Sequence, residues 1–255
     1  MANGLRRELI DTALTEAGKP IRLEILYTRP PGPEPRPVVV FNHGSTGDGS
    51  QPKLFTQSRY SPAVTKYFNE VGWMVVFPQR RGRGKSDGLY DEGFKPDRSG
   101  YSHDPEVALA GLDRALEDVD QVMTWLGTRA DVRHDRVVMA GASRGGVLAV
   151  AYAGRRPKAV WGAINFSGGW LGRRTATYPE VNRAAFSRGA AFPARTLWLH
   201  GSYDRYYPIS HCRENFEHFT REGGHGTFHA LKGGHGLVEQ SALWADLVSG
   251  YLKQL

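Results

Sequence analysis

The stretch RVVMAGASRGGVLAVAYAG, residues 136–154, decides the fold of this protein. It begins as a short run rich in β-branched and apolar residues and ends as a longer apolar run, which is typical of a strand that leads into a helix. The turn between them, GASRGG, matches the pattern G-x-S-x-G with Ser143 at its centre. Gly141 and Gly145 leave room for strand and helix to approach, while the tight turn strains the backbone of Ser143. The pattern predicts a serine held out at a strand end, beside the positive end of the next helix.

Outward from this turn, short β-branched runs alternate with longer helical patterns, as expected for parallel strands joined by crossover helices. The predicted strands are residues 5–12, 20–28, 37–42, 72–78, 136–142, 159–167, 195–200 and 227–232. The predicted helices are residues 61–71, 104–129, 145–155, 209–222 and 238–255. Only the turn 16–19 separates the first two strands, so they are expected to form an antiparallel hairpin. Because no repeat, low-complexity tract or composition break occurs, we interpret residues 1–255 as a single α/β domain.

Composition argues against several classes of partner. The formal net charge is +7, but the basic residues are scattered and form no basic helix face or zinc-finger spacing, so no nucleic-acid partner is expected. The apolar runs are too short to span a membrane, so no membrane partner is expected. The single cysteine, Cys212, cannot form an intramolecular disulfide, and the N-terminus has no signal-peptide pattern. A cytoplasmic location is therefore expected, and the oligomeric state is left open.

A serine nucleophile needs a general base within hydrogen-bond reach and a carboxylate that orients this base. On folds that carry the serine turn, the acid and then the histidine follow the serine along the chain, at the carboxyl ends of strands. Asp204 lies in the loop after the strand 195–200, whereas the loop after the preceding strand contains no carboxylate. We therefore interpret Asp204 as the acid. The alternative is that Asp204 caps the helix that begins near Pro208.

Two copies of the tetrapeptide GGHG, around His225 and His235, offer candidate bases. His225 precedes the strand 227–232 and His235 follows it, so the two are expected roughly 25 to 30 Å apart at about 3.3 Å per residue. Parallel strands present their carboxyl ends at one edge of a sheet. The sequence therefore predicts that His235, and not His225, lies near Ser143 and Asp204.

Acyl transfer also needs hydrogen-bond donors for the negative charge that develops on the substrate oxygen. One donor is expected from the backbone N–H of Arg144, the residue after the serine. The second is expected from the loop FNHGSTGDG, residues 41–49, where we choose Ser45. His43 in the same loop precedes Ser143, which violates the expected order, so we interpret it as a residue that braces the loop.

Five motifs in order carry a family resemblance: HGSTG (43–47), RRGRGKSDG (80–88), GASRGG (141–146), HGSYDRYYP (200–208) and GGHG (233–236). Over nearly its whole length the sequence resembles the α/β-hydrolase superfamily, and it looks most like the dienelactone hydrolase and prolyl-oligopeptidase-like branch. The resemblance implies the α/β-hydrolase fold: an eight-stranded, mostly parallel sheet with its second strand antiparallel, helices on both faces, and a short cap or none. It also implies a triad of Ser143, Asp204 and His235, and chemistry that needs no metal or organic cofactor.

The chain departs from both named relatives. Dienelactone hydrolase has a cysteine at the serine turn, so its lactone specificity does not carry over to a chain with Ser143. Prolyl oligopeptidases place a propeller domain ahead of the hydrolase domain, whereas fewer than forty residues precede the third predicted strand here. This difference argues against a size-gated peptidase. The segment 167–195, where many relatives insert a helical cap, is short, so an open site is expected.

These features predict a serine esterase that cleaves a small-molecule carboxylic ester through a covalent acyl-enzyme. An aminopeptidase-like amide hydrolase is the enzyme alternative, and a non-catalytic binding protein on the same scaffold is an alternative of another class. Arg81 is a candidate ligand for a substrate carboxylate, and Trp170 and Tyr206 are candidates for an apolar pocket. The competing interpretation pairs Arg81 with a local carboxylate such as Asp87 and treats the aromatic side chains as packing.

Overall fold

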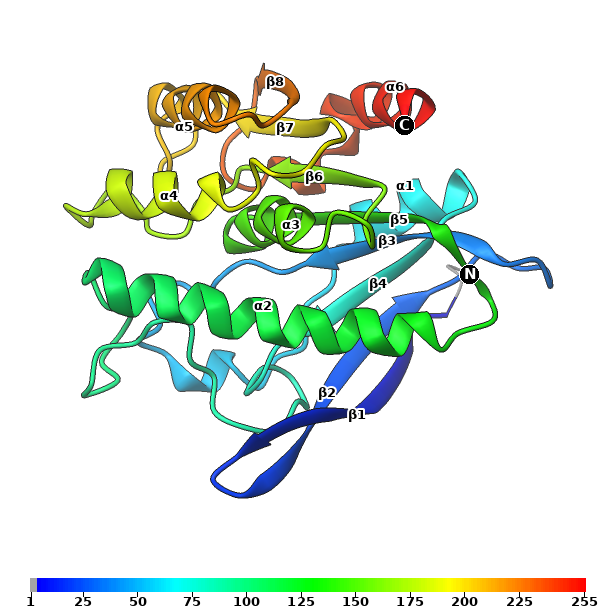
Figure 1. Ribbon diagram of the computed structural model, residues 1–255, viewed down its shortest axis with the longest axis horizontal. Coiled ribbons are helices and arrows are strands. Elements are labelled where there is room, and N and C mark those ends of the chain that lie inside the picture. The colour runs from blue at the N-terminus through cyan, green and yellow to red at the C-terminus, as the bar shows by residue number, and fades with distance from the viewer. Residues whose placement is uncertain (1–3) are drawn as a thin grey trace.

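A computed structural model describes residues 4–255 and contains one sheet of eight strands (Figure 1). The strand order in the sheet is β1-β2-β4-β3-β5-β6-β7-β8. The strands are β1 (Arg6–Glu16), β2 (Lys19–Thr28), β3 (Arg36–Asn42), β4 (Met74–Gln79), β5 (Val132–Ala142), β6 (Gly162–Phe166), β7 (Thr196–Gly201) and β8 (Gly226–Leu231). β2 runs antiparallel to β1 and β4, and the pairings from β4 to β8 are parallel. The predicted mostly parallel sheet with an antiparallel second strand is confirmed.

Helices cover both faces of this sheet (Figure 1). They are α1 (Pro62–Glu70), α2 (Pro105–Gly127), α3 (Arg144–Arg155), α4 (Tyr178–Ser187), α5 (Ile209–Arg221) and α6 (Ala245–Gln254). Apolar side chains from α2, α3, α4 and α5 join one buried cluster, and those from α1 and α6 join a second. Along β3, Val38 and Val40 belong to the first cluster, whereas Val39 and Phe41 belong to the second. Successive side chains of a strand point to opposite faces, so the sheet has a core on each side.

Local sequence signals explain the longest helix. Asp104 precedes α2, and its carboxylate accepts hydrogen bonds from the backbone N–H groups of Glu106 and Val107, while Pro105 occupies the first helical position, where its missing N–H is harmless. Apolar residues recur along α2 at a helical period, and the face that they form is buried against the sheet. Its fully buried members are Leu112, Leu116, Val119, Val122 and Leu126.

The structure differs from the sequence prediction at two helices. The predicted helix 238–255 is shorter, because two 3₁₀ turns (Leu237–Glu239 and Ser241–Leu243) precede α6. Trp244 lies between these turns and α6, is fully buried and donates its indole N–H to the carbonyl of Val238 at 3.1 Å. The second difference is α4, which was not predicted and lies in the segment 167–195. It packs beside α2, α3 and α5, so it extends the helical layer on one face.

A further 3₁₀ turn, η1 (Pro52–Leu54), precedes α1. Within residues 4–255, no helix is both long enough and apolar enough to cross a membrane.

Candidate active site

Ser143 lies between β5 and α3 with φ of 57° and ψ of −125°, a conformation that is strained for a residue with a Cβ. Gly141 and Gly145 explain how the turn closes. A Cβ on Gly145 would overlap the carbonyl oxygen of Asn42, and a Cβ on Gly141 would overlap that of Gly145. The turn therefore needs glycine at both positions, as the sequence pattern predicts. The Ser143 N–H donates to the carbonyl of Phe166 at 3.0 Å, which ties the turn to β6.

Asp204 lies in the loop after β7, and its carboxylate forms hydrogen bonds with two backbone N–H groups and with a histidine. Its Oδ1 accepts the backbone N–H groups of Tyr206 (2.7 Å) and Tyr207 (3.1 Å), and its Oδ2 lies 2.8 Å from His235 Nδ1. Burial by itself raises the pKa of this carboxyl, but the bonds from His235 and the two backbone N–H groups outweigh burial and lower the pKa below its usual value. Asp204 is thus an ionised acceptor in a closed turn. It does not cap α5, which begins at Ile209 after Pro208.

The two histidines of the repeated tetrapeptide lie at opposite ends of β8. His225 precedes the strand, is exposed, and its carbonyl accepts the N–H of Thr196, the first residue of β7, at 2.8 Å. His235 follows the strand, on the side of the sheet where β7 leads to Asp204. Strand direction therefore separates two identical local sequences, and the structure brings only His235 to Asp204.

Tyr207 lies next to both Ser143 and His235. Its ring centroid is 5.4 Å from that of His235, and its hydroxyl donates to the carbonyl of Gly169 at 2.7 Å. Burial raises the pKa of Tyr207, and its contact with the Ser143 side chain opposes that rise. Among the hydrogen bonds of residues 4–255, none joins Ser143 to His235 directly. Catalytic hydrogen bonds often tighten only when substrate binds.

The two predicted donor segments meet at Ser143. Within the described residues, the backbone N–H groups of Ser45 and Arg144 donate to no other protein group. For Arg144 this follows from its place as the first residue of α3, where a helix leaves its N–H groups without partners. The backbone of Gly44 lies against the nucleophile, since a Cβ there would be 3.5 Å from Ser143 Oγ. A free N–H on the residue after the serine, with a second in the loop that contacts the serine through Gly44, can bind a developing oxyanion.

His43 is fixed by the arginine that follows β4. Its carbonyl accepts two hydrogen bonds from the Arg80 guanidinium, both at 3.1 Å, and its Nδ1 lies 2.8 Å from the carbonyl of Gly44. Burial, together with the positive charges of Arg80 and Arg83, lowers the pKa of His43 well below its usual value. The imidazole is therefore neutral at physiological pH and holds the loop that carries Ser45.

Arg81 is buried and forms ion pairs with Asp118 and Glu117 of α2. The expected pairing of Arg81 with Asp87 is wrong, because Asp87 pairs with Arg22 on β2 at 3.0 Å. Arg22 is far from Asp87 in the sequence, so the local sequence around Asp87 could not predict this ion pair.

The two candidate aromatic residues occupy different environments. Trp170 is fully buried, and its indole N–H donates to the carbonyl of Ala108 at 2.8 Å. Tyr206 is 59% exposed, and its ring centroid lies 4.7 Å from that of His235. Of the pair, only Tyr206 is placed to contact a molecule that reaches His235 from solvent.

A cavity of about 250 Å³ opens beside the nucleophile. Its lining includes His43 and Ser45 of the loop after β3, Val238 and Glu239 of the segment after His235, and Ala142, the residue before Ser143. The remaining lining residues come from β3, the loop after it, the segment just before α1, and β4, and are Phe41, Gly44, Arg59, Tyr60, Ser61 and Phe77. A mainly apolar recess between the donor loop and the histidine segment can hold one substituent of a substrate.

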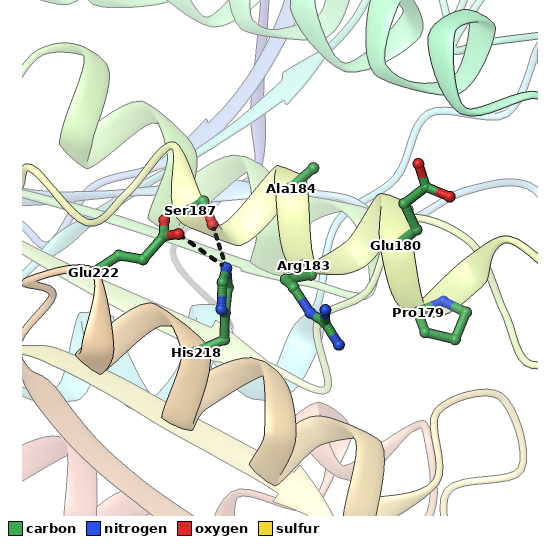
Figure 2. Close-up of a pocket in the computed structure, with 7 residues that line it drawn as sticks. All are labelled: Pro179, Glu180, Arg183, Ala184, Ser187, His218 and Glu222. Carbon is green, nitrogen blue, oxygen red and sulfur yellow. Dashed lines mark hydrogen bonds and ion pairs between the residues drawn. The ribbon is translucent and has the colours of Figure 1, made fainter.

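A second serine, histidine and carboxylate meet between α4 and α5 (Figure 2). There His218 lies 3.1 Å from both Ser187 Oγ and Glu222 Oε1, beside a shallow pocket of about 540 Å³. Both contacts involve the same ring nitrogen, Nε2. A catalytic relay uses one nitrogen for the acid and the other for the nucleophile, so this group is not a second triad.

Sequence reasoning missed two residues near the site. Tyr207 follows Tyr206 in the motif HGSYDRYYP, and only the fold separates the exposed ring from the one beside Ser143. Glu92 lies in the loop between β4 and α2 and is buried between Arg80 and Arg144. No local pattern marks this residue, because its partners are 12 and 52 positions away.

Comparisons with solved structures agree with this architecture. Est1E from Butyrivibrio proteoclasticus, in a structure with bound ferulic acid, has a TM-score of 0.66 at 17% identity over 96% of this chain and 99% of that chain. DcsB, in complex with its substrate analogue, has a TM-score of 0.69 at 13% identity over 98% and 99%. Acylaminoacyl peptidase from Pyrococcus horikoshii has a TM-score of 0.65 at 16% identity over 98% of this chain but 41% of that chain. At these identities the likeness shows the fold alone.

The family assignment comes from the sequence. No curated protein matches the chain, but the family model described as Serine aminopeptidase, S33 (Hydrolase_4) matches residues 33–215, which include Ser143 and Asp204. The narrower dienelactone hydrolase-like branch stays a prediction. Because the model matches well over half of the chain, the protein belongs to the Serine aminopeptidase, S33 family and is a serine hydrolase of the α/β-hydrolase superfamily.

Proposed function

We propose that this protein hydrolyses carboxylic esters, with Ser143 as nucleophile, His235 as general base and Asp204 as the acid that orients it. The observation that carries the proposal is the 2.8 Å contact between His235 Nδ1 and Asp204 Oδ2, on the side of the sheet where Ser143 sits in its strained turn. An ionised Asp204 accepts a hydrogen bond from Nδ1–H, so the proton stays on Nδ1 and Nε2 is free to act as a base.

The reaction follows from these roles. His235 Nε2 takes the hydroxyl proton of Ser143 as Oγ attacks the ester carbon, and a tetrahedral intermediate forms. When this intermediate collapses, the bond to the leaving alkoxide breaks and His235 returns the proton to it. A water molecule then gives a proton to His235 and attacks the acyl-enzyme, and the acid product leaves as Oγ recovers its proton. The backbone N–H groups of Ser45 and Arg144 bind the oxyanion in both steps.

Two observations concern whether the protein cleaves esters or amides. Est1E, found with ferulic acid, matches this chain over 99% of its own length, whereas the acylaminoacyl peptidase shares only 41% of its length with it. The likeness to Est1E, which was solved with a carboxylic acid bound, favours the ester. The family description, Serine aminopeptidase, favours an amide hydrolase as the second candidate. The same triad can perform either reaction.

Labelling with a fluorophosphonate probe, followed by mass spectrometry of the digested protein, tests whether Ser143 is the nucleophile. We expect one adduct, on Ser143, and none in a Ser143→Ala variant. An adduct elsewhere, or no adduct on the folded protein, would reject the catalytic proposal and favour a binding protein on this scaffold.

A panel of p-nitrophenyl esters and aminoacyl p-nitroanilides tests the substrate class. We expect hydrolysis of short-chain esters, because the cavity beside Ser143 is small, and little release from anilides. Efficient cleavage of the anilides with weak cleavage of the esters would replace the esterase by the aminopeptidase-like alternative.

A further inference from the structure

A buried carboxylate links the two segments that carry the proposed oxyanion donors. Glu92 is 2% exposed; its Oε1 lies 2.5 Å from Arg80 Nε, and its Oε2 lies 3.4 Å from a terminal nitrogen of Arg144. Both arginines are also fully buried. Burial alone raises the pKa of Glu92, but the two guanidinium charges outweigh it and lower the pKa. The carboxylate is therefore ionised at neutral pH.

One side of this cluster fixes the start of α3. The Arg144 guanidinium donates to the backbone carbonyls of Glu92 (2.8 Å) and Trp170 (3.0 Å). It also stacks over Tyr101, with its central carbon 3.6 Å from the ring centroid. A side chain held at so many points fixes its own backbone. The N–H of Arg144, directly after Ser143, is thereby held in place.

The other side fixes residues 43–46, which we call the oxyanion loop. On the N-terminal side of Ser45, a terminal nitrogen of Arg80 donates a hydrogen bond to the carbonyl of His43, and Nε of the same guanidinium donates to Glu92. The loop is thus connected to the same carboxylate as α3, through a single arginine side chain.

Two tyrosines connect Glu92 to the far end of the oxyanion loop. The Tyr90 hydroxyl donates to Glu92 Oε2 at 3.0 Å and lies 2.8 Å from the Tyr101 hydroxyl, which accepts the backbone N–H of Thr46 at 3.3 Å. Each hydroxyl can donate one hydrogen bond in this series, Tyr101 to Tyr90 and Tyr90 to Glu92, so every polar group in the series has a partner. Ser45 is therefore flanked on both sides by residues that connect to Glu92.

Stability alone does not account for such a cluster. Buried ion pairs are often replaceable by apolar side chains without loss of stability, because desolvation offsets the attraction between the charges. Their best-supported benefit is geometric specificity. In this chain the geometry concerned is the spacing of two backbone segments that belong to distant parts of the sequence.

We propose that Glu92 is a positioning residue that sets the separation between the Ser45 and Arg144 N–H groups, and so the fit of the oxyanion hole to the transition state. The proposal rests on the esterase function proposed above. Glu92 touches no substrate atom in this scheme; it acts through Arg80, Arg144 and the Tyr90–Tyr101 pair.

The test uses the full chain with a Glu92→Gln substitution, which keeps the size and removes the charge. The new amide group would face one of the two arginines with N–H donors, so that contact is lost. Removal of one oxyanion donor costs about 100- to 1,000-fold in kcat, and its displacement should cost less. We expect kcat on a p-nitrophenyl ester to fall about 10- to 100-fold, with KM changed less than about twofold.

A substrate pair separates positioning from general destabilisation. Sulfur in place of the carbonyl oxygen gives a thionoester, whose larger atom is a poorer hydrogen-bond acceptor and fits an oxyanion hole badly. The wild type should prefer the oxygen ester strongly, and Glu92→Gln should reduce this preference. A matched control is Glu24→Gln, which alters a fully buried carboxylate bound to Ser58 and the Lys85 N–H. The control should lose stability and keep the wild-type preference.

If Glu92→Gln does not fold, Tyr90→Phe provides the milder test, because it removes only one hydroxyl from the link to Thr46. We expect a fall of several-fold in kcat, again with a reduced preference for the oxygen ester. The positioning role would be overturned if either folded variant kept the wild-type kcat and the wild-type preference for the oxygen ester. A change in KM alone would also overturn it, as would a loss in kcat no larger than that of Glu24→Gln. If the wild type carries no fluorophosphonate adduct on Ser143, the proposed function itself fails and this inference fails with it.

Discussion

His235 Nδ1 lies 2.8 Å from Asp204 Oδ2, although the two residues are 31 positions apart and follow different strands. The contact forms because β7 and β8 are parallel neighbours, so the loops that leave them emerge at the same edge of the sheet. Asp204 keeps this orientation through the N–H groups of Tyr206 and Tyr207, which occupy its other oxygen. The relationship leads directly to two predictions about catalysis.

The repeated tetrapeptide gives the first prediction. His235→Ala should lower kcat/KM by about 10⁴-fold or more, because the base that accepts the Ser143 proton is removed. His225→Ala alters an exposed side chain at the opposite end of β8 and should leave ester hydrolysis within about twofold of the wild type. Steady-state kinetics on one ester compare the two variants. Similar losses in both folded proteins would contradict the assignment of the base.

The second prediction concerns the Asp204 carboxylate. In Asp204→Asn the amide oxygen can still accept the Tyr206 and Tyr207 N–H groups, so the loop and the melting temperature should change little. The amide nitrogen, however, would donate to His235 Nδ1, and Nε2 would then carry the proton and could no longer act as a base. We expect kcat to fall on the order of 10⁴-fold. A kcat within tenfold of the wild type would mean that another carboxylate orients the histidine.

Close backbone packing at the serine turn gives a stability prediction. Gly145→Ala would place a Cβ against the carbonyl oxygen of Asn42, so the free energy of unfolding should fall by more than about 4 kcal/mol. The control, Gly127→Ala at the end of α2, has open space around the new Cβ and should be neutral or gain up to about 1 kcal/mol. Urea titration measures both values. An unchanged midpoint for Gly145→Ala would show that the turn can relax.

Arg81 provides a test of carboxylate recognition. Arg81→Ala leaves the buried carboxylate of Asp118 without its partner, so the free energy of unfolding should fall by about 3 kcal/mol. Because the guanidinium is already paired within the protein, kcat/KM should change by the same factor for esters that carry an acidic group and for neutral esters. A selective loss on acidic esters would instead assign Arg81 to substrate binding.

Buried histidines predict acid sensitivity. Burial lowers the pKa of His200 to about 3 and that of His211 to about 4, whereas unfolded histidine has a pKa of about 6.5. Their contribution to stability is therefore complete above about pH 6.5. Between that pH and about 4 the unfolded chain binds protons that the folded chain does not, so the free energy of unfolding falls as pH falls. Each histidine contributes about 1.4 kcal/mol per pH unit in this range.

Urea unfolding between pH 7.5 and 4.5 measures this slope. In His211→Gln the side-chain oxygen can still accept from Asn182 and Asn215, which bond His211 Nε2 at 3.1 and 2.9 Å, but it cannot titrate. The slope should therefore decrease by about 1.4 kcal/mol per pH unit. His225→Gln, at an exposed position, should retain the wild-type slope. Equal slopes in all three proteins would exclude His211 as a source of the acid sensitivity.

The sequence by itself determined the features that depend on local pattern and chain direction. Within residues 4–255, short β-branched runs predicted all eight strands, because strands buried on both faces are continuous apolar runs. Helical patterns predicted five of the six α-helices, because burial of one helix face repeats apolar residues at about 3.6 positions. The glycines of the serine turn identified Ser143, since a backbone this tight excludes side chains at 141 and 145. Strand direction then sufficed to prefer His235 over an identical tetrapeptide, and the structure joins it to Asp204.

Only the tertiary structure decided which side chains from distant segments meet. The partner of Arg81 proved to be Asp118 rather than its near neighbour Asp87, and Glu92 came to connect Arg80 with Arg144. Such pairings depend on how helices and loops pack around the sheet, and neither periodicity nor spacing encodes them. A charged residue in a loop has the same local pattern whether it faces water or occupies a buried cluster, and only the fold decides between the two.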